Sequence, residues 1–147
     1  MVIDASVLTD MFISERKRHD AAKKLAKHIK NQNIRVILPM HAIIEIKSAI
    51  EQERKQSSST NLALDTFPEE NPLEFKMVPI DDNFIADYFD KSIPHLRAGD
   101  LIYVLVAKKY SCPLITEDKA QYKVAKRIGL ETYKIVEYLN TLNRAGT

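Results

Sequence analysis

The amino-acid sequence predicts a three-layer α/β sandwich built on a mostly parallel sheet of four or five strands. Short apolar runs that are typical of buried strands alternate along the chain with segments of helical periodicity. This alternation favours parallel strands joined by helices that cover both faces of the sheet. With 147 residues and only 3 glycines, the chain suits one domain over residues 1–147 and not a fold of tight hairpins.

The first half of the chain is expected to supply two strands and two helices. The predicted elements are a strand over 1–3, a helix around 22–29, a strand over 36–38 that Pro39 stops, and a helix over 40–52. The first helix is indicated by apolar residues that recur at the i, i+3, i+4, i+7 spacing of one buried face.

Residues 56–74 interrupt this pattern. They are rich in Ser, Pro and acidic residues, so we expect a loop or insertion there, with room for a short helix over 62–65. The elements predicted after it are a strand over 75–80, helices over 82–89 and 100–110, a strand over 113–116, a helix over 119–127, and a strand over 132–136 before one or two helical turns through 142. The helix over 100–110 is apolar nearly all round and should be buried on several sides. Gly129 suits the left-handed position just past the end of its helix.

Charge is distributed unevenly along the chain, although the net charge is only +2. Residues 15–35 carry eight Lys and Arg against two acidic residues, and residues 108–127 are also basic. Two basic segments can build a face that attracts phosphate backbones. Scattered lysines on a solvated surface would give the same composition, so charge alone leaves both interpretations open.

The sequence shows no signature of a membrane protein or of a disulfide scaffold. The longest uncharged apolar run, over 101–107, is far shorter than the ~20 residues of a membrane helix, and no basic stretch precedes an apolar run as in a signal peptide. Cys112 is the only cysteine, so no internal disulfide can form. The expected location is therefore the cytoplasm.

Four carboxylates are expected at one edge of the sheet, where ligands bind beyond the carboxyl ends of parallel strands. Asp4 follows the first strand, and Asp118 follows the strand over 113–116. Glu45 lies early in the helix after the second strand, and Asp100 begins the buried helix. Two carboxylates ~4 Å apart repel by about 4 kcal/mol at an effective dielectric of ~20, so four together would require cations. An oxygen-rich site of this kind suits Mg²⁺ or Mn²⁺.

Each carboxylate also has a purely structural interpretation. Asp100 and Asp118 are placed where they could cap a helix, because a carboxylate there accepts the free amides of the first turn. Asp4 could close an Asx turn after its strand, and Glu45 could simply face water. Taken one at a time, the four residues do not distinguish a metal site from ordinary capping.

The order and local context of these acids resemble the PIN-domain family. The resemblance rests on four segments and covers nearly the whole chain: Val2–Leu8, Ile43–Ile46, Gly99–Ala107 and Leu114–Asp118. It implies that Asp4, Glu45, Asp100 and Asp118 are catalytic residues that bind Mg²⁺ or Mn²⁺. It also implies that Ser6 and Thr116 support the site by hydrogen bonding. Ala120 stands where many relatives carry another acidic residue or Asn, a departure that bears on a second metal ion.

The same resemblance implies a metal-dependent endoribonuclease that hydrolyses RNA phosphodiester bonds, and suggests the toxin of a Vap-type toxin–antitoxin pair. The expected partners are RNA, a small antitoxin protein and a second copy of the chain in a homodimer. The alternative is a catalytically silent PIN fold that binds RNA or protein. An aspartyl-phosphate enzyme matches less well, because a haloacid dehalogenase phosphatase needs a second Asp where Ser6 stands, and a receiver domain needs an acid pair beside Asp4.

Other polar residues carry weaker signals. The four histidines show no metal-ligand spacing and no pairing with a nucleophile, so no catalytic histidine is expected. Glu117 is expected to point away from the site. Tyr103 is interpreted as a core residue and Tyr122 as a surface residue, although either ring could stack on a base. The sequence does not identify the residues that bind RNA.

Overall fold

A computed structural model describes residues 1–56 and 73–145, and over these ranges the chain forms five strands and seven helices. The strands are β1 (Val2–Ile3), β2 (Val36–Pro39), β3 (Phe75–Val78), β4 (Leu114–Ile115) and β5 (Thr132–Tyr133). The helices are α1 (Ala5–Phe12), α2 (His19–Asn31), α3 (Ala42–Gln56), α4 (Asp82–Tyr88), α5 (Ala98–Tyr110), α6 (Lys119–Arg127) and α7 (Ile135–Ala145).

The five strands form one all-parallel sheet in the order β3-β2-β1-β4-β5, which confirms the predicted α/β class. β1 lies at the centre, with Val2 opposite Ile37 of β2 on one side and Leu114 of β4 on the other. The chain builds outward from β1 to β3 first and then returns to add β4 and β5 on the other side. The boundary between β1 and β4 is therefore a topological switch point, where open parallel sheets bind their ligands.

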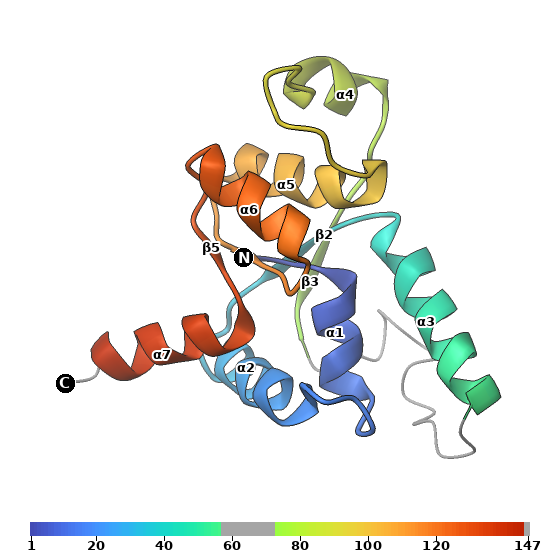
Figure 1. The fold of residues 1–147 in the computed structure, drawn as a ribbon, viewed down its shortest axis with the longest axis vertical. Helices are drawn as coiled ribbons and strands as arrows, with labels where there is room; N and C mark the ends of the chain where they lie inside the picture. The colour runs from blue at the N-terminus through green and yellow to red at the C-terminus, as the bar shows by residue number, and fades with distance from the viewer. Residues whose placement is uncertain (57–72, 146–147) are drawn as a thin grey trace.

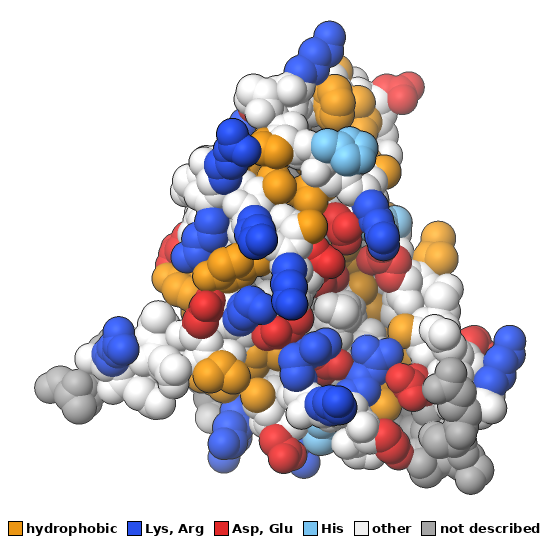
Figure 2. Space-filling model, viewed as in Figure 1, with side chains coloured by type: hydrophobic (Ala, Val, Ile, Leu, Met, Phe, Trp, Pro, Cys, Tyr) orange, Lys and Arg blue, Asp and Glu red, His pale blue; other side chains and the backbone are white. Residues whose placement is uncertain are grey.

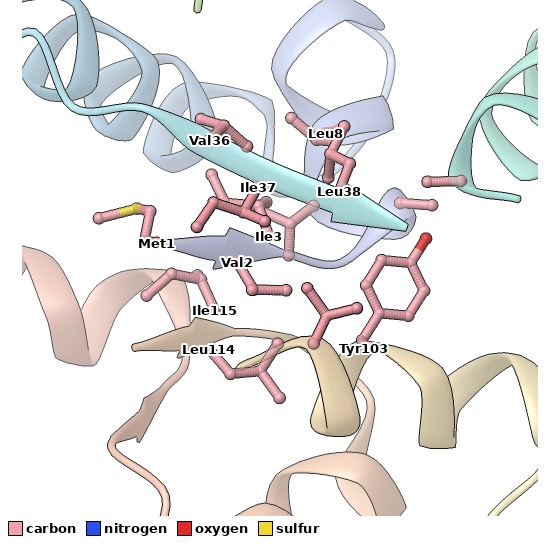
Figure 3. Packing of buried hydrophobic residues seen from close by; sticks show 14 of the residues in the cluster. Met1, Val2, Ile3, Leu8, Val36, Ile37, Leu38, Tyr103, Leu114 and Ile115 are labelled. Atoms are coloured by element: carbon pink, nitrogen blue, oxygen red, sulfur yellow. The ribbon is translucent and has the colours of Figure 1, made fainter. Parts of the chain in front are cut away.

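Helices cover the sheet in layers (Figure 1), with α5 and α6 on one side and α1 and α2 on the other. α5 packs on β1, β2 and β4, and its residues 103–107 are all buried, as its continuous apolar sequence predicts. Figure 3 shows aliphatic side chains of the three central strands packed together, with the Tyr103 ring beside the carboxyl end of β2. Tyr103 is 1% exposed, which confirms its assignment to the core.

Helix α1 was not predicted from the sequence. Asp4 is the N-cap of this helix, and its carboxylate accepts a hydrogen bond from the Ser6 amide. Six of the eight residues of α1 are buried, and two of the six, Thr9 and Asp10, are polar. Polar residues on a buried face hide the apolar periodicity by which a helix is recognised, which is why no helix was predicted there.

The predicted strand over 132–136 was too long. β5 ends at Tyr133, and α7 starts at Ile135, so Val136 is a helical residue with 57% of its surface exposed. Side chains fix this start, because the Ile135 amide donates to Glu117 and the Lys134 amide donates to Glu137. These two acids satisfy free amides at the beginning of α7. Instead of one or two turns, the last helix runs to Ala145 and packs against α2.

Other boundaries shift less. α3 extends to Gln56 instead of ending at 52, α5 begins two residues earlier than expected, and α6 has the bounds that were predicted. Gly129, just past α6, has a φ of +80°, which confirms the left-handed position. Most of the predicted insertion, with the short helix over 62–65, lies outside the described residues. Over the described parts of the chain, none of the helices combines the length and the apolar character that a membrane crossing requires.

Two isoleucines on α3 offer a matched test of the packing. Ile46 is fully buried and Ile44 is 69% exposed, although both have the same side chain and lie on the same helix. We expect Ile46→Ala to lower the free energy of unfolding by about 2–5 kcal/mol, because it removes packed methyl groups and leaves a cavity. Ile44→Ala should change it by no more than about 0.5 kcal/mol. Urea unfolding followed by circular dichroism measures both, and equal losses would contradict the packing described for α3.

Candidate functional site

A cleft of about 590 Å³ opens at the carboxyl ends of β1 and β4. All four acids predicted from the sequence line it, each from a different part of the chain: Asp4, Glu45, Asp100 and Asp118. The parallel sheet explains this convergence, since every strand delivers its carboxyl end to the same edge. The four acids therefore share one cleft instead of serving as four unrelated caps.

Asp4 occupies the deepest position and is only 8% exposed. Its Oδ1 accepts from the Ser6 amide at 3.3 Å, and its Oδ2 accepts from the hydroxyls of Ser6 at 2.9 Å and Thr116 at 3.1 Å. Burial raises the pKa of Asp4 from 3.8 to about 6, and the charge of Glu45 adds to the increase, although the three hydrogen bonds oppose it. Ser6 and Thr116 thus stand where the sequence placed them, both donating to Asp4.

Asp118 combines the capping role with a place in the cleft. It is the N-cap of α6, and its Oδ1 accepts from the Gln121 amide at 2.7 Å. Its own amide donates to the Thr116 hydroxyl, which also binds Asp4, so one buried threonine fixes the positions of two acids. Both structural interpretations are correct: Asp118 caps α6, and Asp4 accepts from the amide two residues on, as in an Asx turn, which also caps α1. Both carboxylates nevertheless line the cleft.

Asp100 does not cap its helix, contrary to the structural interpretation considered for it. α5 begins at Ala98, so Asp100 lies within the first turn, and the N-cap position belongs to Arg97, whose side chain makes no capping hydrogen bond. Burial raises the pKa of Asp100, and the neighbouring charges of Asp118 and Glu45 raise it further. Gln121, fully buried, donates to the Asp100 carbonyl at 2.9 Å and so ties α6 to the first turn of α5.

Glu45 is held at the cleft by a core tyrosine. The Tyr103 hydroxyl donates to Glu45 Oε2 at 2.5 Å, and burial together with this carboxylate raises the pKa of Tyr103, so the hydroxyl stays protonated. His41 Nε2 lies 3.9 Å from the same oxygen. At Gly99 a Cβ atom would come within 3.2 Å of Glu45 Oε1, so a larger residue there would require this carboxylate to shift by a few tenths of an ångström.

The donor atoms suit a hard cation, but the acids do not close around a single point. Carboxylate oxygens are the ligands that Mg²⁺ and Mn²⁺ prefer. Burial is the largest cause of the raised pKa of Asp100, and the charges of Asp118 and Glu45 add to it, whereas that of Arg97 opposes it. In residues 1–56 and 73–145, however, no group of three acidic, His or Cys side chains is already close enough to hold one ion. The cleft therefore fits an ion that binds one or two carboxylates and keeps water, as Mg²⁺ usually does.

Two arginines of the basic segment 15–35 lie in this cleft, although the sequence did not single out either of them. Arg16 and Arg18 line it beside the acids, and Figure 2 shows Lys and Arg side chains around a group of acidic ones in the middle of this face. Glu117 also lines the cleft, but its carboxylate accepts from the Ile135 amide and lies 4.0 Å from Lys134 Nζ. Glu117 is thereby committed to the start of α7.

Asp4 gives a test of the like-charge cleft that does not depend on activity. Because its folded pKa lies above its unfolded pKa, its contribution to stability is present below about pH 4 and is lost as the pH rises through about 6. In EDTA, the free energy of unfolding of Asp4→Asn relative to that of the wild type should therefore rise by up to roughly 3 kcal/mol between about pH 4 and pH 8, at 1.36 kcal/mol per pKa unit. Urea unfolding at both pH values measures the gain, and parallel pH profiles for the two proteins would contradict it.

Solved structures match the chain over most of its length. A chain in the structure of FitAB bound to an IR36 DNA fragment superposes with a TM-score of 0.57 at 15% identity, covering 91% of this chain and 94% of that one. A domain of a functionally unknown protein from Methanocaldococcus jannaschii superposes with a TM-score of 0.49 at 20% identity, covering 90% of this chain and 88% of its own. The first of these confirms the fold and, at this identity, nothing further.

Sequence comparison identifies the family. No curated protein sequence matches the chain closely enough to count as a relative. The profile of the PIN domain, in contrast, matches residues 1–127, which run from β1 to the end of α6 and include every acid of the cleft. The resemblance inferred from the four sequence segments is confirmed, and the chain belongs to the PIN-domain family.

Proposed function

We propose that this protein is a metal-dependent endoribonuclease that hydrolyses RNA phosphodiester bonds. The observation that carries the proposal is the convergence of Asp4, Glu45, Asp100 and Asp118 in one cleft of a PIN-domain chain. A phosphodiester is an anion, and an acidic cleft repels it unless cations are present. The same carboxylates that would hold such cations therefore make the proposed activity dependent on them.

Mg²⁺ or Mn²⁺ would be held by carboxylates from this set of four. When bound, such an ion lowers the pKa of a water molecule and stabilises charge on a phosphate oxygen. The chain itself supplies orientation. Ser6 and Thr116 fix Asp4, Tyr103 fixes Glu45, and the α6 amides hold Asp118. Because most of these supports come from buried residues, the carboxylates need little rearrangement when a cation arrives.

The partners follow from the family resemblance and extend the proposal. We propose that RNA is the substrate, that a small antitoxin protein inhibits the nuclease, and that two copies of the chain form a homodimer. The FitAB chain supports the fold on which this proposal is based. In that structure FitAB is bound to a DNA fragment. A homodimer would place two clefts on one particle.

Hydrolysis of RNA tests the proposal directly. A mixed-sequence, end-labelled RNA is incubated with the protein in Mn²⁺, in Mg²⁺ and in EDTA. We expect cleavage in either metal and none in EDTA. Asp100→Asn should lower the rate by roughly a hundredfold or more, since several kcal/mol of charge stabilisation depend on the metal ligands. Circular dichroism confirms that the variant is folded.

Asp87→Asn is the matched control, because Asp87 is an exposed acid of α4 that does not line the cleft. It removes the same charge and should cleave like the wild type. Cleavage that persists in folded Asp100→Asn would refute the assignment of the site. If the wild type binds RNA but never cleaves it in either metal, the chain is instead a catalytically silent PIN fold that serves as a binding module.

A further inference from the structure

The cleft has a second chemical half, made by Arg16 and Arg18 in the segment between α1 and α2. Both side chains line the same cleft as the four acids. Neither contacts any of these four, because the carboxylates that they bind belong to Asp10 and Glu53. One cleft therefore presents both carboxylates and guanidinium groups, and the two arginines do not form ion pairs with the four acids.

A buried carboxylate holds the two arginines in place. The Asp10 side chain is only 2% exposed, and its two oxygens are shared: Oδ1 accepts from Arg16 at 3.4 Å and Oδ2 accepts from Arg18 Nε at 2.6 Å. A charge this deeply buried requires compensation, which explains why the loop turns two arginines toward it. Asp10 thus fixes the position of both guanidinium groups at the cleft.

The two arginines differ in what remains for a ligand. Arg16 bridges Asp10 and Glu53 of α3, so its guanidinium joins the loop to a neighbouring helix. Arg18 contributes only Nε to Asp10, and within residues 1–56 and 73–145 its terminal nitrogens have no hydrogen-bond or ion-pair partner. Its side chain is 45% exposed, against 27% for Arg16. Arg16 therefore has a structural role, whereas Arg18 has hydrogen-bond donors available for a ligand.

We propose that Arg18 binds a phosphate of the RNA strand next to the phosphate at the carboxylates, and that Asp10 and Arg16 position it for that contact. The inference rests on the proposed function, since it concerns the same cleft. Two terminal nitrogens of a guanidinium match two oxygens of a phosphate in a planar, charge-assisted pair. A strand that crosses the cleft would thereby meet metal-bound carboxylates at one phosphate and a fixed cation at another. Arg18 is on this account a substrate-positioning residue.

RNA binding separates this role from a structural one. All variants are made in the Asp100→Asn protein, so that the strand stays intact, and a fluorescein-labelled single-stranded RNA is titrated in Mg²⁺ by anisotropy over a series of salt concentrations. Arg18→Gln should bind roughly tenfold more weakly, as expected for a lost hydrogen bond to a charged group. The slope of log affinity against log salt should fall by about 0.7, the value of one phosphate contact to a single strand.

Two further variants make the test specific. Arg18→Lys keeps the charge but loses the planar fork, so it should keep the salt slope and bind with intermediate affinity. Arg35→Gln is the matched control: Arg35 is an exposed arginine paired with Glu74, it precedes β2 at the opposite end of the sheet, and its loss should change affinity less than about twofold. Arg18→Gln should unfold at a lower temperature than the parent, because it leaves the buried Asp10 with Arg16 alone, so binding is measured at a temperature at which both proteins are folded.

Each remaining outcome decides one claim. If Arg18→Gln binds RNA no more weakly than Arg35→Gln, or if neither the parent nor the wild type binds RNA in Mg²⁺, the role assigned to Arg18 is overturned. If the binding loss is as expected but the wild type never cleaves RNA, the phosphate site stands and the nuclease assignment fails. If the wild type cleaves RNA and Arg18→Gln, made in the wild type, leaves the KM for RNA unchanged, the nuclease stands and the phosphate site fails.

Discussion

Repulsion between carboxylates at one edge of a parallel sheet is the constraint on which the rest of the site depends. Asp4, Glu45, Asp100 and Asp118 reach a single cleft because the strands all end there, and the raised pKa values of Asp4 and Asp100 record the cost of burial and crowding. The fold keeps these groups in place with neutral hydrogen-bond donors instead of lysines or arginines, namely the hydroxyls of Ser6, Thr116 and Tyr103. Negative charge is therefore held in position without being neutralised, which leaves it available to a cation.

The core and the site share their supports. α5 is buried on the central strands, and the same helix carries Asp100, the Tyr103 hydroxyl and the close approach at Gly99. α6 is locked to α5 by the buried Gln121, so the two acids that precede or begin these helices are fixed relative to one another. Opposite them, the buried Asp10 orders Arg16 and Arg18 along the cleft. Buried residues therefore hold both the acidic and the basic side chains of the cleft in position.

The sequence allowed prediction of features that depend on a local pattern of residues, such as the end of a strand or the burial of a helix. Asp4 directly follows an apolar run and Asp118 comes shortly after another, so their place at the strand ends could be predicted. The all-round apolar sequence of α5 likewise predicted its burial. Contacts between distant residues were not visible. Asp10 is a charged residue in a buried helix, and only its contacts with Arg16 and Arg18 explain its burial. Arg16 also binds Glu53, which is 37 positions away in the sequence. Similarly, Glu117 was expected to point away from the site, but it lines the cleft, and the amide that it caps lies 18 residues along the chain.

The central claim is that carboxylates of this cleft, Asp100 among them, bind a divalent cation. The most direct measurement is titration of the metal-free protein with Mn²⁺ by isothermal titration calorimetry, for the wild type, Asp100→Asn and Asp87→Asn. The account predicts saturable binding that is markedly weaker in Asp100→Asn and unchanged in Asp87→Asn, because only the former removes an acid of the cleft. A folded wild type that shows no saturable binding, or that binds no better than Asp100→Asn, would contradict it.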